Sequence, residues 1–183
     1  AGCRIDVGVA LGGSGIQDSY SPGTSLKERA AIRRKEQENS LEFFGLPSAN
    51  TEFLEFKNDK TDQLLAPPAN QAILERFVAS KNPDIVFLPH GNDTNSGHRN
   101  MYSMLKKGIA KLKHPVVAFL GSDPKTIKMR VDVYTPFDEA EAEWKGKLLR
   151  FHDSQHQRNL NTHGHGFDHR ILDLNRLSAR DLH

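Results

Sequence analysis

The sequence predicts an α/β protein with a mainly parallel β-sheet that is covered by helices on both faces. Strand and helix patterns alternate along the chain, and the expected strands are apolar on both faces, as is typical of parallel sheets between helices. The expected strands are residues 4–11, 51–56, 84–89, 114–121 and 129–134. The expected helices are residues 26–44, 68–80, 98–113 and 137–152, followed by a last helix from about residue 167.

Capping and turn residues set the boundaries of these elements. The apolar run Arg4–Leu11 (RIDVGVAL) ends in a loop rich in glycine, serine and proline. Ser25 and Glu28 form the capping-box pattern before the first helix, and Gly45 ends that helix. The sequence contains no internal repeat and no interdomain linker, so we expect residues 1–183 to form a single domain.

Composition excludes several classes of protein. Hydrophobic residues make up 37% and charged residues 26%, which excludes a disordered chain. No stretch approaches the roughly 18 apolar residues of a membrane span, and no secretory signal is visible, so we expect a cytoplasmic protein. Cys3 is the only cysteine, which excludes an intrachain disulfide. The charges nearly balance, with 25 Lys and Arg against 23 Asp and Glu, so we expect no nucleic-acid partner.

Two polar loops, residues 12–24 and 90–98, follow apolar strands. Because open parallel sheets bind ligands outside the carboxyl ends of their strands, we predict a site shared between these loops. The glycines at 12–15 do not complete a dinucleotide-binding fingerprint, since Gln17 and Asp18 stand where its third glycine should be. These glycines can also serve only to permit a tight turn.

The segment His90–Arg99 (HGNDTNSGHR) is the most informative part of the sequence. It combines two imidazoles, one carboxylate and two carboxamides at the end of an apolar strand. Imidazole and carboxylate are the ligands that suit catalytic zinc. We expect His98 in the first turn of a helix, where the backbone fixes its direction. A histidine in such a position also commonly caps a helix or binds backbone groups.

Four stretches, in the same order along the chain, resemble motifs of the PIG-L/LmbE-type N-deacetylases. Residues 82–99 (NPDIVFLPHGNDTNSGHR) resemble the family signature PDVVF…ND.HPDHR. Residues 9–15 (VALGGSG) stand where the family has a strand and a TDGExG loop. Residues 33–45 (RRKEQENSLEFFG) are similar to the family helix RxxExxxAxxxLG. Residues 144–176 look like the K…SQ…GF…R…NR tail of one branch of the family.

The resemblance implies a Rossmann-like fold and the zinc-dependent hydrolysis of the N-acetyl group of an amino sugar or glycoconjugate. It places His98 as a zinc ligand, and Arg33, Gly13 and Ser14 as candidate substrate-binding residues. A structural ion pair between Arg33 and a nearby glutamate is the alternative. Asn95 takes the place of the first histidine of H-P-D-H, and Asp93 is the one acid of its loop that can substitute for the general base, so both are candidate catalytic residues. Asp93 can equally tie down its loop through backbone N–H groups.

The sequence departs from the family pattern in one important respect. It contains no H-P-D-D, the motif in which the family carries two zinc ligands and the general base, so His98 is the one matched zinc ligand of three. We therefore expect that the chain is incomplete at both ends, that the first strand of the fold is missing, and that zinc binds weakly. We also expect little deacetylation by this polypeptide alone. A missing central strand would expose apolar edges, which predicts association with a second copy or another chain.

Two further hypotheses remain open on the sequence. The first is a non-catalytic carbohydrate- or nucleotide-binding domain that has kept the scaffold and lost the metal. The second concerns the histidines near the C-terminal end, where His152 with His156, and His165 with His169, have the i, i+4 spacing of a metal-binding pair on a helix. Exposed or capping histidines would have the same spacing.

Overall fold

The computed structural model describes residues 2–10, 16–59 and 64–181. The chain divides into two compact units, which are considered separately. The strand unit comprises residues 1–11 and 51–132, and the helical unit comprises residues 12–50 and 133–183.

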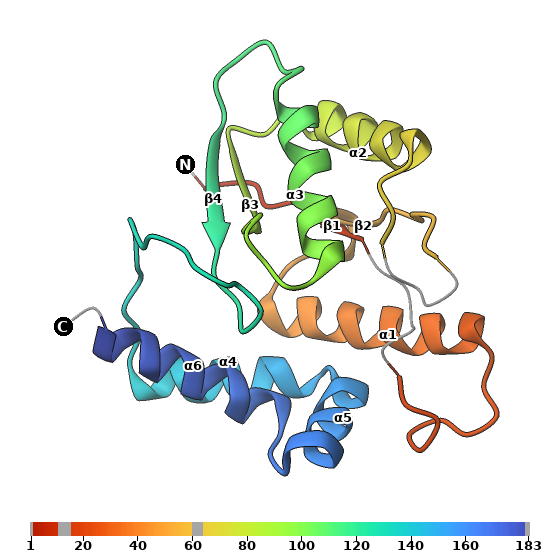
Figure 1. Ribbon diagram of the computed structural model, residues 1–183, viewed down its shortest axis with the longest axis vertical. Helices are drawn as coiled ribbons and strands as arrows, with labels where there is room; N and C mark the ends of the chain where they lie inside the picture. Colours follow the sequence, from red (N-terminus) through yellow and green to blue (C-terminus); the bar gives the residue numbers. More distant parts are fainter. Residues whose placement is uncertain (1, 11–15, 60–63, 182–183) are drawn as a thin grey trace. The chain divides into compact units, whose positions relative to one another are not determined.

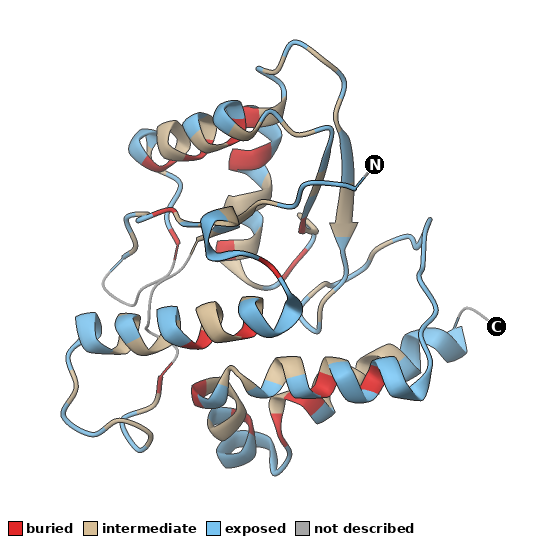
Figure 2. Ribbon diagram, turned by 180° about the vertical axis from the view of Figure 1, so that it is seen from behind, coloured by how far each residue is buried: buried red, intermediate tan, exposed pale blue. Residues whose placement is uncertain are grey.

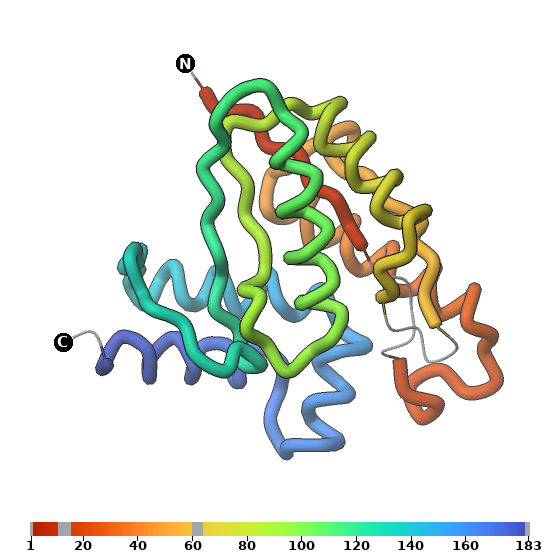
Figure 3. The backbone as a smooth tube through the Cα atoms, turned by 45° about the horizontal axis from the view of Figure 1, so that its top comes forward, coloured from red at the N-terminus to blue at the C-terminus, as the bar shows by residue number. Residues whose placement is uncertain are grey.

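The strand unit contains two pairs of parallel strands. β1 (Val7–Val9) pairs with β2 (Thr51–Phe53), and β3 (Ile85–Pro89) pairs with β4 (Val117–Gly121) (Figure 1). The parallel pairing and the mixed α/β class are as predicted. In the described part of the unit each strand has one partner, so the strands form two short sheets rather than one continuous sheet. The smooth trace of Figure 3 shows β3 and β4 running side by side in the same direction.

Two helices complete the strand unit. α2 (Pro68–Lys81) begins with a proline at its first position, where the missing N–H costs nothing, and α3 (Ser96–Ile109) packs against both α2 and β3. Several residues of these elements are buried, as the red segments of the ribbon in Figure 2 show, and the apolar ones among them form the core of the unit. The buried residues of this core are Leu54, Leu64, Leu74, Val78, Leu88, Met104 and Leu105.

The helical unit begins with α1 (Leu26–Phe44), whose boundaries were predicted correctly. The Ser25 side chain accepts from the backbone N–H of Glu28, and the Glu28 side chain accepts from the backbone N–H of Ser25, so the capping box is complete. Gly45 ends the helix with a φ of 87°, in the left-handed region that favours glycine.

Three further helices, α4 (Glu139–Arg150), α5 (Asp153–His163) and α6 (Phe167–Asp181), form the rest of the helical unit together with a short 3-10 turn, Ser48–Asn50. The sequence pattern predicts one helix to residue 152. The structure instead ends α4 at Arg150 and starts α5 at Asp153. None of the described helices combines the length and the apolar character that a membrane span requires.

The predicted strand at residues 129–134 is wrong. These residues are described, and they have no regular secondary structure. Val131, Val133 and Tyr134 are exposed, so their alternation with polar residues does not reflect a buried face. A strand needs a neighbour to pair with, and the chain passes here from one compact unit to the other.

Candidate metal centre

The candidate site begins in the loop between β3 and α3. Asn95 is the N-cap of α3, since its Oδ1 accepts a hydrogen bond of 2.8 Å from the backbone N–H of Gly97. His98 is therefore in the first turn of α3, as predicted. Asp93 is buried in the loop, and its Oδ1 accepts a 2.6 Å hydrogen bond from the backbone N–H of Asn95. The structure thus gives Asp93 the loop-fixing role that the sequence offered as one of its two interpretations.

A second loop, which follows β4, is fastened to the first by backbone hydrogen bonds. The N–H of Thr94 donates to the carbonyl of Lys125 at 2.9 Å, and the N–H of Ile127 donates to the carbonyl of Asn92 at 3.0 Å. Because β3 and β4 are parallel neighbours, their carboxyl ends lie at the same edge, and these bonds hold the two loops together there.

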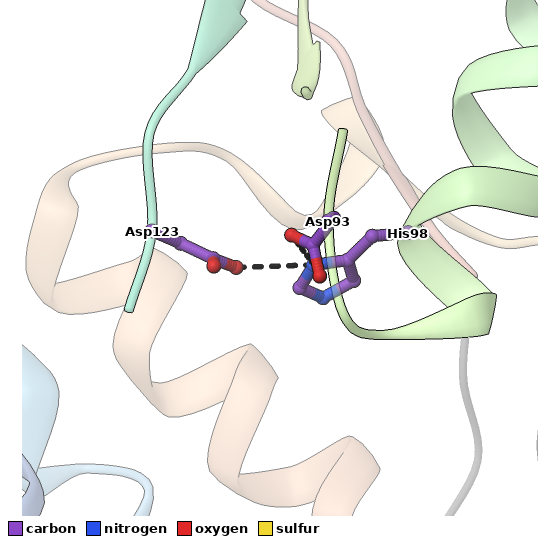
Figure 4. A group of neighbouring side chains, drawn as sticks. All are labelled: Asp93, His98 and Asp123. Atoms are coloured by element: carbon purple, nitrogen blue, oxygen red, sulfur yellow. Dashed lines mark hydrogen bonds and ion pairs between the residues drawn. The ribbon is translucent and has the colours of Figure 1, made fainter. Parts of the chain in front are cut away.

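Three ionisable side chains from these two loops and α3 meet at one point (Figure 4). Nδ1 of His98 lies 2.9 Å from Oδ2 of Asp93 and 3.1 Å from Oδ2 of Asp123. The side chain of Asp93 is fully buried, whereas those of His98 and Asp123 are 27% and 34% exposed. One side of the cluster is therefore anchored in the protein, and the other is open to solvent.

Local hydrogen bonds keep the buried carboxyl group ionised. Burial alone would raise the pKa of Asp93, but hydrogen bonds from the backbone of Asn95 and from His98, together with the charge of Lys125, hold it below the ordinary value for aspartate. The buried anion is therefore compensated by its neighbours and is available to orient His98 or to bind a cation.

The donor set of the cluster fits a divalent metal ion. The imidazole nitrogen and the two carboxylate oxygens all lie within 4.8 Å of one another. One nitrogen and two oxygens are ligands that zinc accepts, and partial exposure leaves room for water or substrate. Among the described residues, this is the one group of three or more histidine, cysteine, aspartate or glutamate side chains so closely placed.

Asp123 is the member of the cluster that the sequence pattern did not single out. It lies just after the apolar strand 114–121, as Asp93 lies shortly after the strand 84–89. Consecutive parallel strands are commonly neighbours in the sheet. The presence of an acidic residue shortly after each of these two strands is therefore the feature of the sequence from which Asp123 could have been predicted. The polar composition of residues 12–24 had instead favoured that loop as the second part of the site.

Arg33, the predicted substrate-binding arginine, belongs to the helical unit. Its Nη1 lies 2.9 Å from Oε2 of Glu36 and 3.5 Å from Oγ of Ser154. The structural ion pair proposed as the alternative for Arg33 is therefore present. Gly13 and Ser14, the other candidate substrate-binding residues, lie outside the described residues, and the site expected between residues 12–24 and 90–98 stays a prediction.

Two histidines of the C-terminal pairs have an acidic neighbour within the helical unit. Nδ1 of His169 lies 3.7 Å from Oδ2 of the exposed Asp173. Nδ1 of His156 lies 3.3 Å from Oδ1 of Asp168, a buried aspartate whose Oδ2 accepts a 2.6 Å hydrogen bond from Nε of Arg150. His152 is largely shielded, and burial together with the charge of Arg33 lowers its pKa. These contacts describe a packed polar interior and no second metal cluster among the described residues.

The fold and the cluster together define an α/β protein with a polar, metal-compatible centre at the carboxyl ends of parallel strands. Residues 4–108 match the profile of the GlcNAc-PI de-N-acetylase family, PIG-L. The chain therefore belongs to the PIG-L family. Comparison with curated protein sequences gave no match.

Two solved structures share the fold. An N,N'-diacetylchitobiose deacetylase from Pyrococcus horikoshii, solved with an inhibitor, superposes with a TM-score of 0.64 at 19% identity, over 82% of this chain and 60% of the deacetylase. A conserved protein of Thermus thermophilus gives a TM-score of 0.53 at 15% identity, over 84% of this chain and 68% of its own. The chain thus spans less than two thirds of the length of the deacetylase that it resembles.

Proposed function

We propose that the chain is the metal-binding part of a zinc-dependent N-deacetylase that hydrolyses the N-acetyl group of an amino sugar or glycoconjugate. The observation that carries the proposal is the convergence of Asp93, His98 and Asp123 in a member of the PIG-L family. The shared fold with a diacetylchitobiose deacetylase agrees with this substrate class.

The residues present fit zinc, and they have distinct tasks. His98 would hold the ion, with Asp93 and Asp123 as the adjoining carboxylates. When bound, zinc supplies polarisation of the acetamide carbonyl and acidification of a water molecule. Asp93 is too buried to meet substrate, and its task is to orient His98 and to balance charge. Asn95 holds the start of α3 in place through its cap, and an amide cannot relay a proton.

The family's general base belongs to the H-P-D-D motif, which this sequence does not contain. We therefore propose that residues 1–183 by themselves bind metal and sugar but release little acetate. A non-catalytic carbohydrate-binding domain would also bind sugar without releasing acetate, so the deacetylase has to be tested in the protein expressed from the complete reading frame.

The decisive experiment measures acetate release from N-acetylglucosamine conjugates by the protein expressed from the complete reading frame that contains these residues. We expect zinc-dependent turnover that disappears in His98→Gln and persists in Asp132→Asn, a control in which an exposed aspartate paired with Arg130 is changed. Sugar binding without acetate release under these conditions would favour the non-catalytic carbohydrate-binding alternative.

A further inference from the structure

Residues 129–134 (MRVDVY) have the alternation of a β-strand but pair with no described strand. The odd-numbered positions are methionine and two valines, and the even-numbered positions are arginine, aspartate and tyrosine. These residues contain no turn or bend, and in the described part of the chain no backbone hydrogen bond reaches them. Figure 1 shows them as part of the thin tube between β4 and α4. The segment therefore combines the sequence of a strand with an unpaired backbone.

Two contacts show which way the segment directs its groups. Nε of Arg130 lies 2.6 Å from Oδ1 of Asp132, so these two side chains lie on the same side, as residues i and i+2 of an extended strand do. The carbonyl of Lys128 accepts a hydrogen bond of 3.0 Å from Nδ2 of Asn92. Because the backbone groups of successive residues in a strand point to opposite edges, those at positions 129, 131 and 133 point away from Asn92. One edge of the segment is therefore free to pair.

The start of the segment is held away from the free edge of β4. The N–H of Ile127 donates to the carbonyl of Asn92 at 3.0 Å, and Thr126 forms an antiparallel bridge with Asp93. Both partners belong to the loop after β3, whereas a hairpin onto β4 would lie on the edge of β4 that faces away from β3. These contacts therefore disfavour a hairpin with the preceding strand of the same chain.

The segment is complementary to a second copy of itself. If two copies run antiparallel about a two-fold axis at Val131, Arg130 of each copy lies directly opposite Asp132 of the other. The same register sets Met129 opposite Val133, and Val131 opposite its own counterpart. Cross-strand pairs of opposite charge or of apolar side chains contribute roughly 0.2–1 kcal/mol each. Charge and apolar character therefore match in one and the same register.

Neighbouring registers lack this match. An axis at Arg130 or at Asp132 would set two like charges directly opposite each other, which is destabilising. A slip by one residue would set the valines opposite charged side chains, because successive side chains of a strand point to opposite faces. The axis at Val131 avoids both penalties, so the sequence singles out this register.

We propose that residues 129–133 of two copies of the chain pair as an antiparallel β-ribbon about a two-fold axis at Val131. The ribbon has about six backbone hydrogen bonds, formed by positions 129, 131 and 133 of each copy. A two-stranded ribbon is only marginally stable, and this one is much smaller than an interface of roughly 1,000 Å², so the pairing is transient and depends on protein concentration. No residue of the metal centre takes part, so Asp132→Asn should weaken the ribbon and leave zinc binding and turnover intact.

The experiment traps the ribbon with single cysteines in a Cys3→Ser chain, which removes the one native thiol. In Val131→Cys the two thiols would meet on the axis, at a Cα separation of about 5.5 Å that a disulfide spans. Val133→Cys is the matched control, because the two copies of position 133 would lie about 13 Å apart along the ribbon. Both valines are exposed, at 46% and 67%, so a random collision reaches either thiol.

Diamide oxidises the thiol pairs to disulfides, and non-reducing gel electrophoresis measures the rate at which the 183-residue chain becomes a covalent dimer. We expect Val131→Cys to form the dimer at least about tenfold faster than Val133→Cys, because pairing holds the thiols at an effective concentration of about millimolar, against micromolar protein. A mixture of Met129→Cys and Val133→Cys should also form a dimer rapidly, since these positions are opposite each other.

Charge changes in the Val131→Cys chain test the register independently of folding. Arg130→Glu sets like charges opposite each other and should slow dimer formation to the rate of Val133→Cys. Adding Asp132→Lys restores opposite charges and should restore the rate. Circular dichroism establishes that each variant is folded.

Equal rates in Val131→Cys and Val133→Cys, or no dimer in either folded variant, would overturn the inference. Rapid trapping in the 183-residue chain that is absent from the protein expressed from the complete reading frame would also overturn it, because a strand of the longer protein would then occupy the segment. The trapping does not depend on acetate release, so neither result bears on the proposed deacetylase.

Discussion

Glu36 and Ser154 are joined by two hydrogen bonds although 118 residues separate them in the sequence. Oε1 of Glu36 accepts the backbone N–H of Ser154 at 2.6 Å, and its Oε2 accepts the Ser154 hydroxyl at 2.8 Å. Both residues are buried, and the ion pair with Arg33 compensates the charge of Glu36. One carboxylate thus fastens the start of α5 to the middle of α1, within the helical unit.

Breaking this link should destabilise the protein. We expect Glu36→Gln to lower the free energy of unfolding by about 2 kcal/mol, because hydrogen bonds to a buried charged group contribute roughly 1.5–3 kcal/mol. Ser154→Ala should cost about 1 kcal/mol, and the double variant should cost less than the sum of the two. Urea denaturation measures these values. Glu42→Gln, which changes an exposed glutamate of the same helix, should leave the free energy of unfolding unchanged. A loss in Glu42→Gln equal to that in Glu36→Gln would show that the hydrogen bonds between Glu36 and Ser154 are not what stabilises the protein.

Gly166 lies where no larger residue fits. A Cβ on this residue would collide with the ring of His156 and would lie 2.6 Å from Oδ1 of Asp168. The Asp168 side chain cannot easily move away, because its other oxygen, Oδ2, accepts a hydrogen bond from Nε of Arg150. We expect Gly166→Ala to lower the free energy of unfolding by about 1–3 kcal/mol, the range for overpacking a buried site. Gly146→Ala is the matched control, since its Cβ would find its nearest atom at an ordinary 3.6 Å. Because alanine favours helices, this control should raise stability by up to about 1 kcal/mol in thermal unfolding.

Elements with their own local signals could be predicted from the sequence. The boundaries of α1 followed from the capping box of Ser25 and Glu28 and from Gly45, because these residues act on the backbone next to them. The apolar run of β3 needed no tertiary information either. Residues 129–134 had the alternation of a strand, but a strand requires a partner, and the identity of a partner is not encoded locally.

The difference between local signals and tertiary contacts also explains which residues of the candidate site could be predicted from the sequence. Asp93 and His98 lie five residues apart, and the start of α3 brings them together, so one segment of sequence contains both. Asp123 joins them only because β4 pairs with β3, which is a tertiary fact. The ion pair of Arg33 with Glu36 followed from the spacing of one helical turn, whereas its contact with Ser154 depends on how α1 and α5 pack.

Asn95 should matter to stability through its cap rather than through its amide nitrogen. Asn95→Ala removes the acceptor for the N–H of Gly97 and should cost about 1 kcal/mol in the free energy of unfolding. Asn95→Asp retains an oxygen acceptor at the start of α3, where a negative charge is also favourable, and should stay within about 0.5 kcal/mol of the unaltered chain. Chemical denaturation of the metal-free protein compares the two. Equal losses in both variants would show that the cap is not what Asn95 contributes.

Asp123→Asn should change stability in opposite directions with and without metal. In excess chelator the substitution removes one of two carboxylates that face each other across Nδ1 of His98, and relief of their repulsion should raise the free energy of unfolding by about 1 kcal/mol. In excess zinc the unaltered chain gains the binding free energy of the ion, since ligands that bind only the folded state stabilise it. The variant gains less binding free energy from zinc, so in excess zinc its melting temperature should fall below that of the unaltered chain.

Differential scanning fluorimetry at about pH 8, with chelator and with zinc, measures both shifts in melting temperature of Asp123→Asn. The control Asp132→Asn should show neither shift. A variant less stable than the unaltered chain in chelator would mean that Asp123 is held by hydrogen bonds that outweigh the repulsion, and the two carboxylates would then need no cation between them.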